Sequence, residues 1–421
     1  MSLALTPFRR SQLATGALFC ALGFQYATWA SRIPAIKTDL GLTPAQVGVL
    51  LMAAGVGASV SFPVVTYLMR RVGSRLLSLG SALALAGVLL ALAAAPNYPT
   101  ALLVLCVDGV LVGCLNTAMN AQGAAIEARH GRTTMAKLHA TFSAGSLLAA
   151  LLASAVLTAT SSVMAHFVVA AVLLGLLAAA AQGGLLPDDR PAGSARKQPR
   201  TAWRMPARVT LWMCCAMAFG TVTEGSMNDW STLYMEDVAG ASGQIAPLGI
   251  AVVSGMMLLA RIFADGWRSR WGDGRVVLVG SVLACAGLAF ALVAGGVLPA
   301  LIGFACVGLG IAAVTPCVYV AAARQGGNTL PLVAAMGTTG LLAGPPLIGF
   351  VADASSLVWG LALVSLSALV VAVCSTRIDW EPGEAATGPE HDAPGPESDV
   401  RVAEGNVPVS EGDADGSLRQ V

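Results

Sequence analysis

Two carboxylic residues occur in the stretch TVTEGSMNDW, residues 221–230, inside an apolar run that extends from Val209 to Tyr234. These are Glu224 and Asp229, and a third acid, Asp108, lies in another apolar run. An acidic residue at bilayer depth costs about 2.5–3.5 kcal/mol on insertion scales, so it is expected to face a cavity or a partner. Because burial favours the protonated form of a carboxyl group, a carboxyl that loads and unloads a proton between two conformations can couple transport to a proton gradient.

We interpret Glu224 as that proton site, since it lies deep in its run and the sequence suggests no buried base beside it. The competing interpretation is a carboxylic acid that hydrogen-bonds to a neighbouring helix. Asp229 is expected at the outer rim, next to Trp230 and Tyr234, which resemble an aromatic belt at the membrane interface. The only cation expected near these acids is Arg32, at the outer interface.

Three of the apolar runs carry amide or aromatic side chains, and two of these three also carry the acids. Residues four positions apart share one face of a helix, and several of the polar residues are spaced in this way. At a rise of about 1.5 Å per residue, Gln25, Asp108 and Glu224 fall in the same half of the bilayer, where they could converge. Each amide is either a solute ligand or a hydrogen-bonding group between helices, and the tryptophan either stacks on a sugar-like ring or anchors the interface. The candidate substrate- and proton-binding residues are Gln25 and Trp29, Asn116 and Asn120, Glu224 and Asn228, and the acids Asp108 and Asp229.

A second set of residues is expected to act in gating, that is, in opening and closing the ends of the bundle. Charged residues crowd the ends of two apolar runs on the expected cytoplasmic side, where solvated anchors are the alternative interpretation. Arg261 and Asp265 stand four residues apart and are expected to form an ion pair. Glycine and proline remove side-chain bulk and backbone donors, which predicts a bend at Gly344–Pro346 and a similar kink at Pro316. The candidate gating residues are Arg70, Arg71, Gly73, Arg261, Asp265, Arg270, Gly344 and Pro345.

The composition indicates that these elements lie in a lipid bilayer. Of the 421 residues, 56% are hydrophobic and 11% are charged, whereas soluble domains have about 25% charged residues. Apolar runs of about 20 residues can cross a hydrocarbon core as helices, and backbone groups in lipid must bond internally. The predicted class is an all-α membrane protein. Its twelve predicted helices are 11–31, 45–69, 76–95, 101–123, 138–160, 163–186, 207–234, 246–265, 276–295, 299–323, 330–352 and 357–376.

Loop charge and composition predict the topology and the domains. Lysine and arginine concentrate in alternate loops, which places both termini in the cytoplasm. Arg9 and Arg10 lead into a run longer than a signal peptide, so the first helix is expected to be resident. The acidic, proline- and glycine-rich end of the chain is expected to be disordered. The predicted domains are a six-helix half at 1–186, a cytoplasmic linker at 187–206, a second half at 207–376 and a cytoplasmic tail at 377–421.

The two predicted halves repeat a short motif. Arg71-x-Gly73 follows the second predicted helix, and Arg270-x-Gly272 follows the eighth. A single such triplet is weak evidence, but its recurrence at one topological position indicates the repeated architecture of secondary transporters.

With these features the chain resembles the major facilitator superfamily. The loop YLMRRVGSR departs from the superfamily pattern, since Thr66 and Arg70 replace its glycine and aspartate, while Arg71 and Gly73 match it. The resemblance implies two pseudo-symmetric six-helix halves, alternating access, and a cavity lined mainly by helices 1, 4, 7 and 10. More local stretches resemble the MosC/YbjJ-like bacterial subgroup, which implies a bacterial cytoplasmic (inner) membrane and leaves the substrate open. These stretches are WASRIPAIKTDLGL, RRVGSR, NAQGAAIE with HATFSAG, EGSMNDWSTLYM and GLLAGPPLIGF.

Three functions are compatible with these observations. The first is a proton-coupled carrier, acting as a monomer, for a small polar solute that is sugar- or polyol-like; the second is proton-linked efflux of a cationic or amphipathic compound. The third is a non-transporting sensor that signals through the tail. The sequence contains no H-E-x-x-H, G-x-S-x-G or P-loop motif, so neither an enzyme nor a primary pump is expected. The nine cysteines lack metal-type spacing, and we expect no cofactor, metal or nucleic-acid partner.

Overall fold

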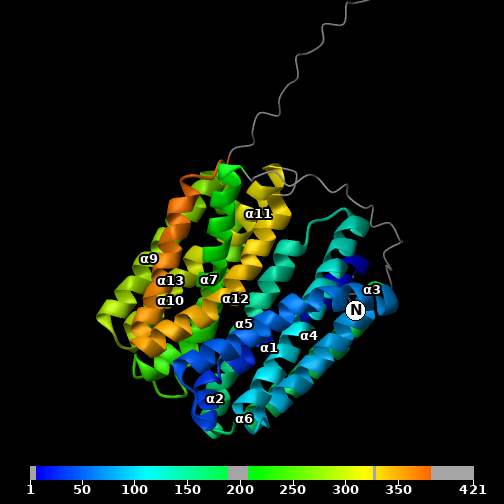
Figure 1. Cartoon of the computed structure of the whole chain (residues 1–421). Helices are drawn as coiled ribbons and strands as arrows, with labels where there is room; N and C mark the ends of the chain where they lie inside the picture. Colours follow the sequence, from blue (N-terminus) through cyan, green and yellow to red (C-terminus); the bar gives the residue numbers. More distant parts are fainter. Residues whose placement is uncertain (1–5, 188–206, 326–328, 381–421) are drawn as a thin grey trace, which may run out of the picture. The chain divides into compact units, whose positions relative to one another are not determined.

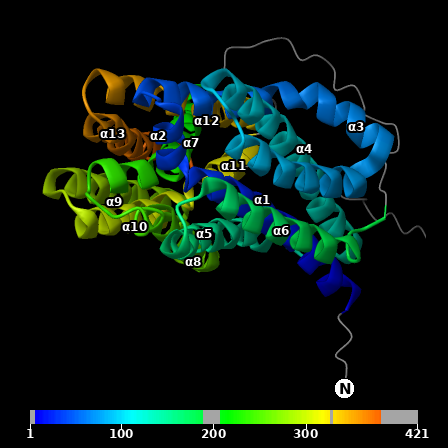
Figure 2. The same cartoon turned by 90° about the horizontal axis from the view of Figure 1, so that it is seen from below.

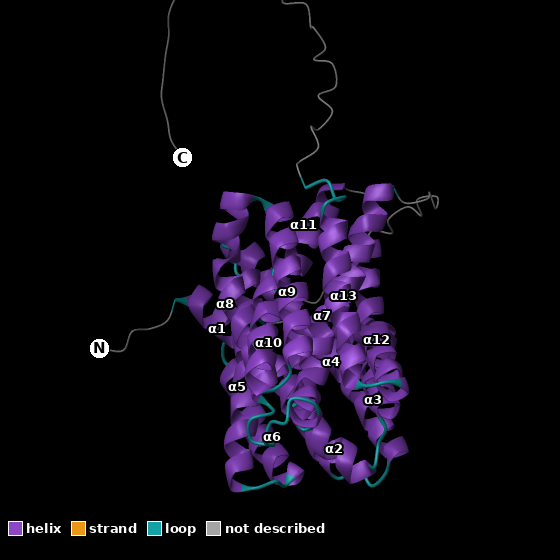
Figure 3. Ribbon diagram, turned by 90° about the vertical axis from the view of Figure 1, so that its left-hand side faces the viewer, coloured by secondary structure: helices purple, strands orange, loops and turns teal. Residues whose placement is uncertain are grey.

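The computed structural model describes residues 6–187, 207–325 and 329–380. Within these residues all regular secondary structure is helical, as Figures 1 and 3 show. The described helices belong to one unit, Met1–Glu381. The predicted linker beyond Pro187, and the predicted tail beyond Trp380, lie outside the described residues.

The helices match the predicted spans closely. The helix α3 holds two predicted spans, α10 and α11 together form one, and the short α2 was not predicted, so the described chain has the twelve spanning segments of two six-helix halves. The helices are α1 Pro7–Ala30, α2 Ile33–Leu40, α3 Pro44–Ala93, α4 Tyr98–His130, α5 Met135–Ala159, α6 Val163–Gln182, α7 Arg208–Asp237, α8 Leu248–Trp271, α9 Asp273–Ala294, α10 Val297–Ile311, α11 Val314–Gln325, α12 Thr329–Ala354 and α13 Leu357–Ser375.

Most of these helices are apolar enough to cross a membrane on composition alone. Nine helical segments of the described chain, with α10 and α11 taken together, satisfy that criterion. The helices α1 and α7 are long enough but are not among them. These two helices carry most of the polar candidate residues, which lower their mean hydropathy. Their polar faces must therefore be covered by other helices.

The repeated arginine–glycine motif has a backbone explanation. Gly73 joins the two spans of α3 with φ 77° and ψ 170°, and Gly272 joins α8 to α9 with φ 80° and ψ 154°. Backbone of this kind is essentially restricted to glycine. The two halves therefore turn between consecutive helices in the same way at the same topological position.

One of the two predicted proline distortions interrupts a helix. The helix α10 ends at Ile311 and α11 begins at Val314, two residues before Pro316. Proline has no N–H to donate to the carbonyl of Ala312, and its ring clashes with that group. By contrast, α12 continues as a helix through Pro345 and Pro346.

In the first half, α1 packs against α5 and α6, as Figure 2 shows. The main contacts between the halves join α3 to α12 and α5 to α8.

We refer to the end of the bundle at which α2 lies as the α2 side; α11 lies at the opposite end (Figure 3). On the α2 side, a Cβ atom added at Gly349 would lie 2.7 Å from the carbonyl oxygen of Pro44 and 2.9 Å from the Cα of Gly48. The halves therefore meet backbone to backbone there, which only glycine permits.

This close approach predicts that Gly349→Ala destabilises the protein. The added methyl group meets backbone atoms that cannot move aside, so we expect a loss of about 1–3 kcal/mol in the free energy of unfolding. Thermal unfolding of the purified protein measures the effect. The matched control is Gly87→Ala, because no atom lies within 4 Å of a Cβ built there. Equal unfolding midpoints for the two variants would contradict the expectation.

Candidate functional site

Two neighbouring residues of α1 bind the carboxyl groups of two other helices. The side-chain amide of Gln25 donates to Asp108 Oδ1 on α4 at 2.7 Å. The Tyr26 hydroxyl donates to Asp229 Oδ1 on α7. Successive side chains of a helix point about 100° apart, so one turn of α1 reaches both partners. We call these four residues the α1 polar cluster.

The acids of the α1 polar cluster are buried. Asp108 is 1% exposed and Asp229 is 5% exposed, and Gln25 is fully covered. Their hydrogen-bond partners, Gln25 and Tyr26, are neutral donors, and the ion pairs found within the described residues include neither acid. Of the three residues that the sequence suggested could converge, Gln25 and Asp108 are in contact, whereas Glu224 pairs with Arg261. Asp229, in contrast, lies inside the bundle and not at the rim that the sequence suggested.

Tyr26 is a functional candidate that the sequence reasoning missed. It stands one position after Gln25, off the face that the four-residue spacing selects. A buried tyrosine hydroxyl needs a hydrogen-bond partner, and this rule could have identified Tyr26 from its place inside an apolar run. Its bond to Asp229 joins the first half of the chain to the second.

Glu224 has a basic partner. Arg261 on α8 donates to Glu224 Oε1 at 3.0 Å and also donates to the hydroxyl of Ser143 on α5. The expectation that no buried base lies beside Glu224 is therefore wrong, and so is the expected pair between Arg261 and Asp265. Asp265 instead approaches Arg268 at 3.6 Å, and its side chain is 80% exposed. The four-residue spacing permits a pair along α8, but the Arg261 side chain is 18% exposed, and a charge that is largely removed from water needs a partner of opposite charge.

The Glu224–Arg261 pair differs from the α1 polar cluster in its access to solvent. The Arg261 side chain is 18% exposed and that of Glu224 is 24% exposed. The pair is therefore partly accessible to solvent, whereas the acids of the α1 polar cluster are covered by protein.

Arg32 does not serve as a counter-ion for these acids. Its guanidinium donates to the backbone carbonyl of Ser161, in the connection between α5 and α6. Burial lowers the pKa of Arg32, and the carboxylates of Asp39 and Glu236 act in the opposite direction. Arg32 therefore ties α1 to the α5–α6 connection within the first half.

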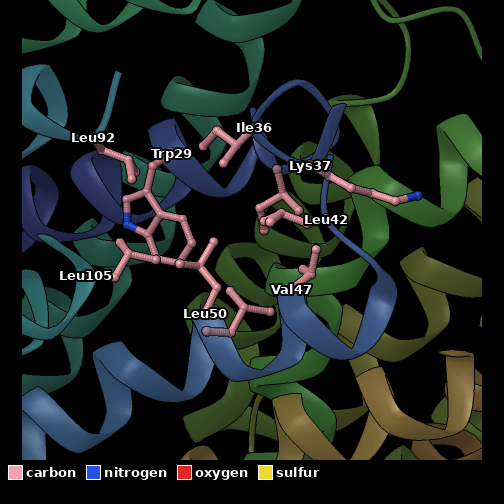
Figure 4. Close-up of a pocket in the computed structure, with 10 residues that line it drawn as sticks. Trp29, Ile36, Lys37, Leu42, Val47, Leu50, Leu92 and Leu105 are labelled. Atoms are coloured by element: carbon pink, nitrogen blue, oxygen red, sulfur yellow. The ribbon is translucent and has the colours of Figure 1, made fainter. Parts of the chain in front are cut away.

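The predicted aromatic belt is also wrong. Trp230 and Tyr234 are fully buried, and Trp29 is 2% exposed. The helix α7 continues to Asp237, so its aromatic residues lie within the bundle and not at its edge. Figure 4 shows Trp29 at one end of a small apolar pocket, beside Leu92 and Leu105. Trp29 therefore packs in the core, edge-on to Tyr26 at a ring distance of 5.3 Å.

The three asparagines make local hydrogen bonds. The side-chain amide of Asn120 donates to Asn116 Oδ1 at 3.0 Å and to the carbonyl of Asn116 at 2.7 Å. Asn228 donates to the backbone carbonyl of Glu224 at 3.0 Å. Asn116 and Asn120 share an accessible face of α4, as the spacing predicts, but none of the hydrogen bonds among the described residues joins them to the α1 polar cluster. Their role as solute ligands stays a prediction.

The candidate gating charges at the end opposite α2 show no contact across the halves among the described interactions. Arg70, Arg71 and Arg270 are exposed, and Arg71 lies over the ring of Tyr67 at 5.4 Å. On the α2 side, in contrast, Lys37 pairs with Asp237 across the halves at 2.6 Å. This ion pair and the glycine contact join the halves on the α2 side. The gating role of the arginines, Gly73 and Gly344–Pro345 stays a prediction.

Comparisons with a family model, with related sequences and with solved structures agree with one another. The family model described as Major Facilitator Superfamily matches residues 14–330. An uncharacterized MFS-type transporter of Yersinia pestis is 31% identical, over 89% of this chain and 97% of that protein. The membrane protein MosC of Rhizobium meliloti is 31% identical, over 85% of this chain and 87% of that protein. Among solved structures, the nucleoside transporter NupG is similar in fold, with a TM-score of 0.69 and 15% identity over 88% of this chain and 99% of that one.

The bond between Tyr26 and Asp229 predicts a stability effect. Tyr26→Phe removes the hydroxyl that bonds the buried carboxyl, and we expect a loss of about 1–3 kcal/mol in the free energy of unfolding. Thermal unfolding of the purified protein measures this loss. Tyr67→Phe is the control, since Tyr67 is 58% exposed and its contact with Arg71 involves only the ring. A Tyr26→Phe variant as stable as Tyr67→Phe would show that the bond contributes nothing.

Proposed function

Since this chain belongs to the major facilitator superfamily, we propose that it is a proton-coupled transporter that moves a small polar solute by alternating access. Its family and its relatives identify it as a membrane transporter and not an enzyme. The coupling ion, the solute class and the sites that bind them are the proposal.

One observation carries the proposal: two buried carboxyl groups are held by neutral donors from adjacent residues of α1. A buried carboxylate without a cation is costly in a membrane, and a proton removes the cost. Asp229 also binds Tyr26 across the halves, so a bond that must change when the halves move includes a group that can be protonated. We therefore assign the proton role to Asp229 with Asp108.

This assignment differs from the sequence interpretation, which gave the proton role to Glu224. Glu224 pairs with Arg261 at 3.0 Å. A proton on Glu224 would leave the guanidinium without its countercharge, and breaking a partly buried pair is unfavourable. Glu224 is better suited to contact the solute.

The solute in this proposal is neutral and polar, sugar- or polyol-like. The competing function is efflux of a cationic or amphipathic compound, which the same two acids favour because their negative charge would attract a cation. NupG is described as a nucleoside transporter, so nucleosides belong in a panel of solutes. We further propose a monomer in the bacterial inner membrane, with the α2 side outward and both termini in the cytoplasm.

A ligand screen comes first. Thermal unfolding of the purified protein is followed with polyols, sugars, nucleosides, amino acids and quaternary ammonium compounds at two pH values. Stabilisation by a neutral polar solute supports the proposal and supplies a substrate for flux measurements. Stabilisation restricted to cations would replace it by the efflux function.

Asp229→Asn is expected to abolish proton-driven accumulation while it preserves exchange. With one proton per solute, a gradient of one pH unit supports about tenfold accumulation, since a factor of ten corresponds to about 1.4 kcal/mol. We expect the variant in proteoliposomes to lose this accumulation but to exchange labelled for unlabelled solute, because the asparagine cannot release a proton. The control is Asp353→Asn, an exposed aspartate at the end of α12. Undiminished dependence on the gradient in Asp229→Asn would refute the assignment.

A further inference from the structure

We infer that the Glu224–Arg261 pair is the charge filter of the solute site and selects solutes that carry no net charge. The inference rests on the proposed transport function and adds the residues that decide which solutes bind.

Accessibility distinguishes this pair from the other ionisable groups in the interior. Its two side chains are 18% and 24% exposed, whereas Asp108 and Asp229 are 1% and 5% exposed. A solute that enters the bundle can therefore reach the pair directly. The acids of the α1 polar cluster are covered by protein and can exchange a proton more readily than they can bind a solute.

The pair lies where the two halves meet. Glu224 comes from α7 and Arg261 from α8, while the second partner of Arg261 is Ser143 on α5 in the first half. Ser143 is 3% exposed and so belongs to the packed contact between α5 and α8. A solute bound to this pair touches groups that must separate when the halves move, as alternating access requires.

The chemistry of the pair sets the charge rule. A guanidinium only donates hydrogen bonds and a carboxylate only accepts them, whereas a hydroxyl group does both. Neighbouring hydroxyl groups can therefore satisfy Arg261 and Glu224 together. A cation would bind Glu224 and leave the guanidinium unpaired, and an anion would do the reverse, each at the cost of a partly buried charge without a partner.

A series of six-carbon ligands that are matched in size and differ in charge tests this rule. The probes are sorbitol, which is neutral, glucamine, which is a cation, and gluconate, which is an anion. Dissociation constants come from thermal-shift titrations of the full-length purified protein. Wild-type protein is expected to prefer sorbitol; a wild-type protein that binds glucamine or gluconate equally well, or none of the three, overturns the inference.

The variants should change the preference in opposite directions. Arg261→Gln leaves an unpaired carboxylate and is expected to favour glucamine, while Glu224→Gln leaves an unpaired guanidinium and is expected to favour gluconate. Each preference relative to sorbitol should change at least about tenfold, or about 1.4 kcal/mol. The combined exchange Glu224→Arg with Arg261→Glu restores opposite charges and should restore the preference for sorbitol. Two single variants with the same preference as the wild type would overturn the inference.

The control uses an ion pair that joins the two halves directly. Lys37→Gln and Asp237→Asn break an ion pair of 2.6 Å on the α2 side, where both side chains are more exposed. They should leave the charge preference unchanged, and a shift as large as that of Arg261→Gln would contradict a local filter. The titrations need no proton gradient, so this outcome is separable from the flux of Asp229→Asn.

Discussion

The structure depends on one constraint: a carboxyl group within a membrane helix must have a partner. Of the four acids of α7, three are each bonded to a different element, namely Glu224, Asp229 and Asp237, and the fourth, Glu236, is exposed near the end of the helix. Glu224 is bonded to α8, Asp229 to α1 and Asp237 to α2. Because each acid requires its own partner, the polar sequence of α7 determines which elements surround it. An apolar helix could rotate among its neighbours at far smaller cost.

The same partners join the two halves of the protein. Asp229 and Asp237 bind residues of the first half directly, and Glu224 reaches it through Arg261 and Ser143. At about 1.5 Å per residue the three acids span about 20 Å along α7, so the links follow one another across most of the membrane. If the halves separate at either end, these links must break in sequence. On the proposed function, protons and solute affect this movement by changing the stability of individual links.

The sequence predicted what depends on local pattern. Hydropathy located the spanning segments, and Gly73 and Gly272 marked the equivalent turns because their backbone conformation requires glycine. Depth along the helices predicted that Gln25 meets Asp108, which the structure confirms. Each of these correct predictions depends only on the neighbouring residues in the sequence, or on how far a residue lies from the end of its helix.

The errors share a physical origin. A spacing of four residues shows that Arg261 can reach Asp265, but the better partner lies on another helix, and the sequence of a single helix does not contain that information. Tyr26 was missed because its role comes from α7 and not from α1. Three further residues at the end of α7 placed Trp230 and Tyr234 within the bundle. Each error therefore concerns a tertiary contact that competes with a local pattern.

The two acids of TVTEGSMNDW illustrate why position alone did not separate their roles. They are five residues apart on one helix, about 7.5 Å along its axis, in the same apolar run. Their difference comes from their partners: a cation open to solvent for Glu224, and a neutral hydroxyl within the core for Asp229. A carboxylate that already has a countercharge gains little from a proton, and a carboxyl that is covered cannot receive a solute. On the proposed function, α7 therefore places proton and solute on adjacent turns without requiring them to compete for one group.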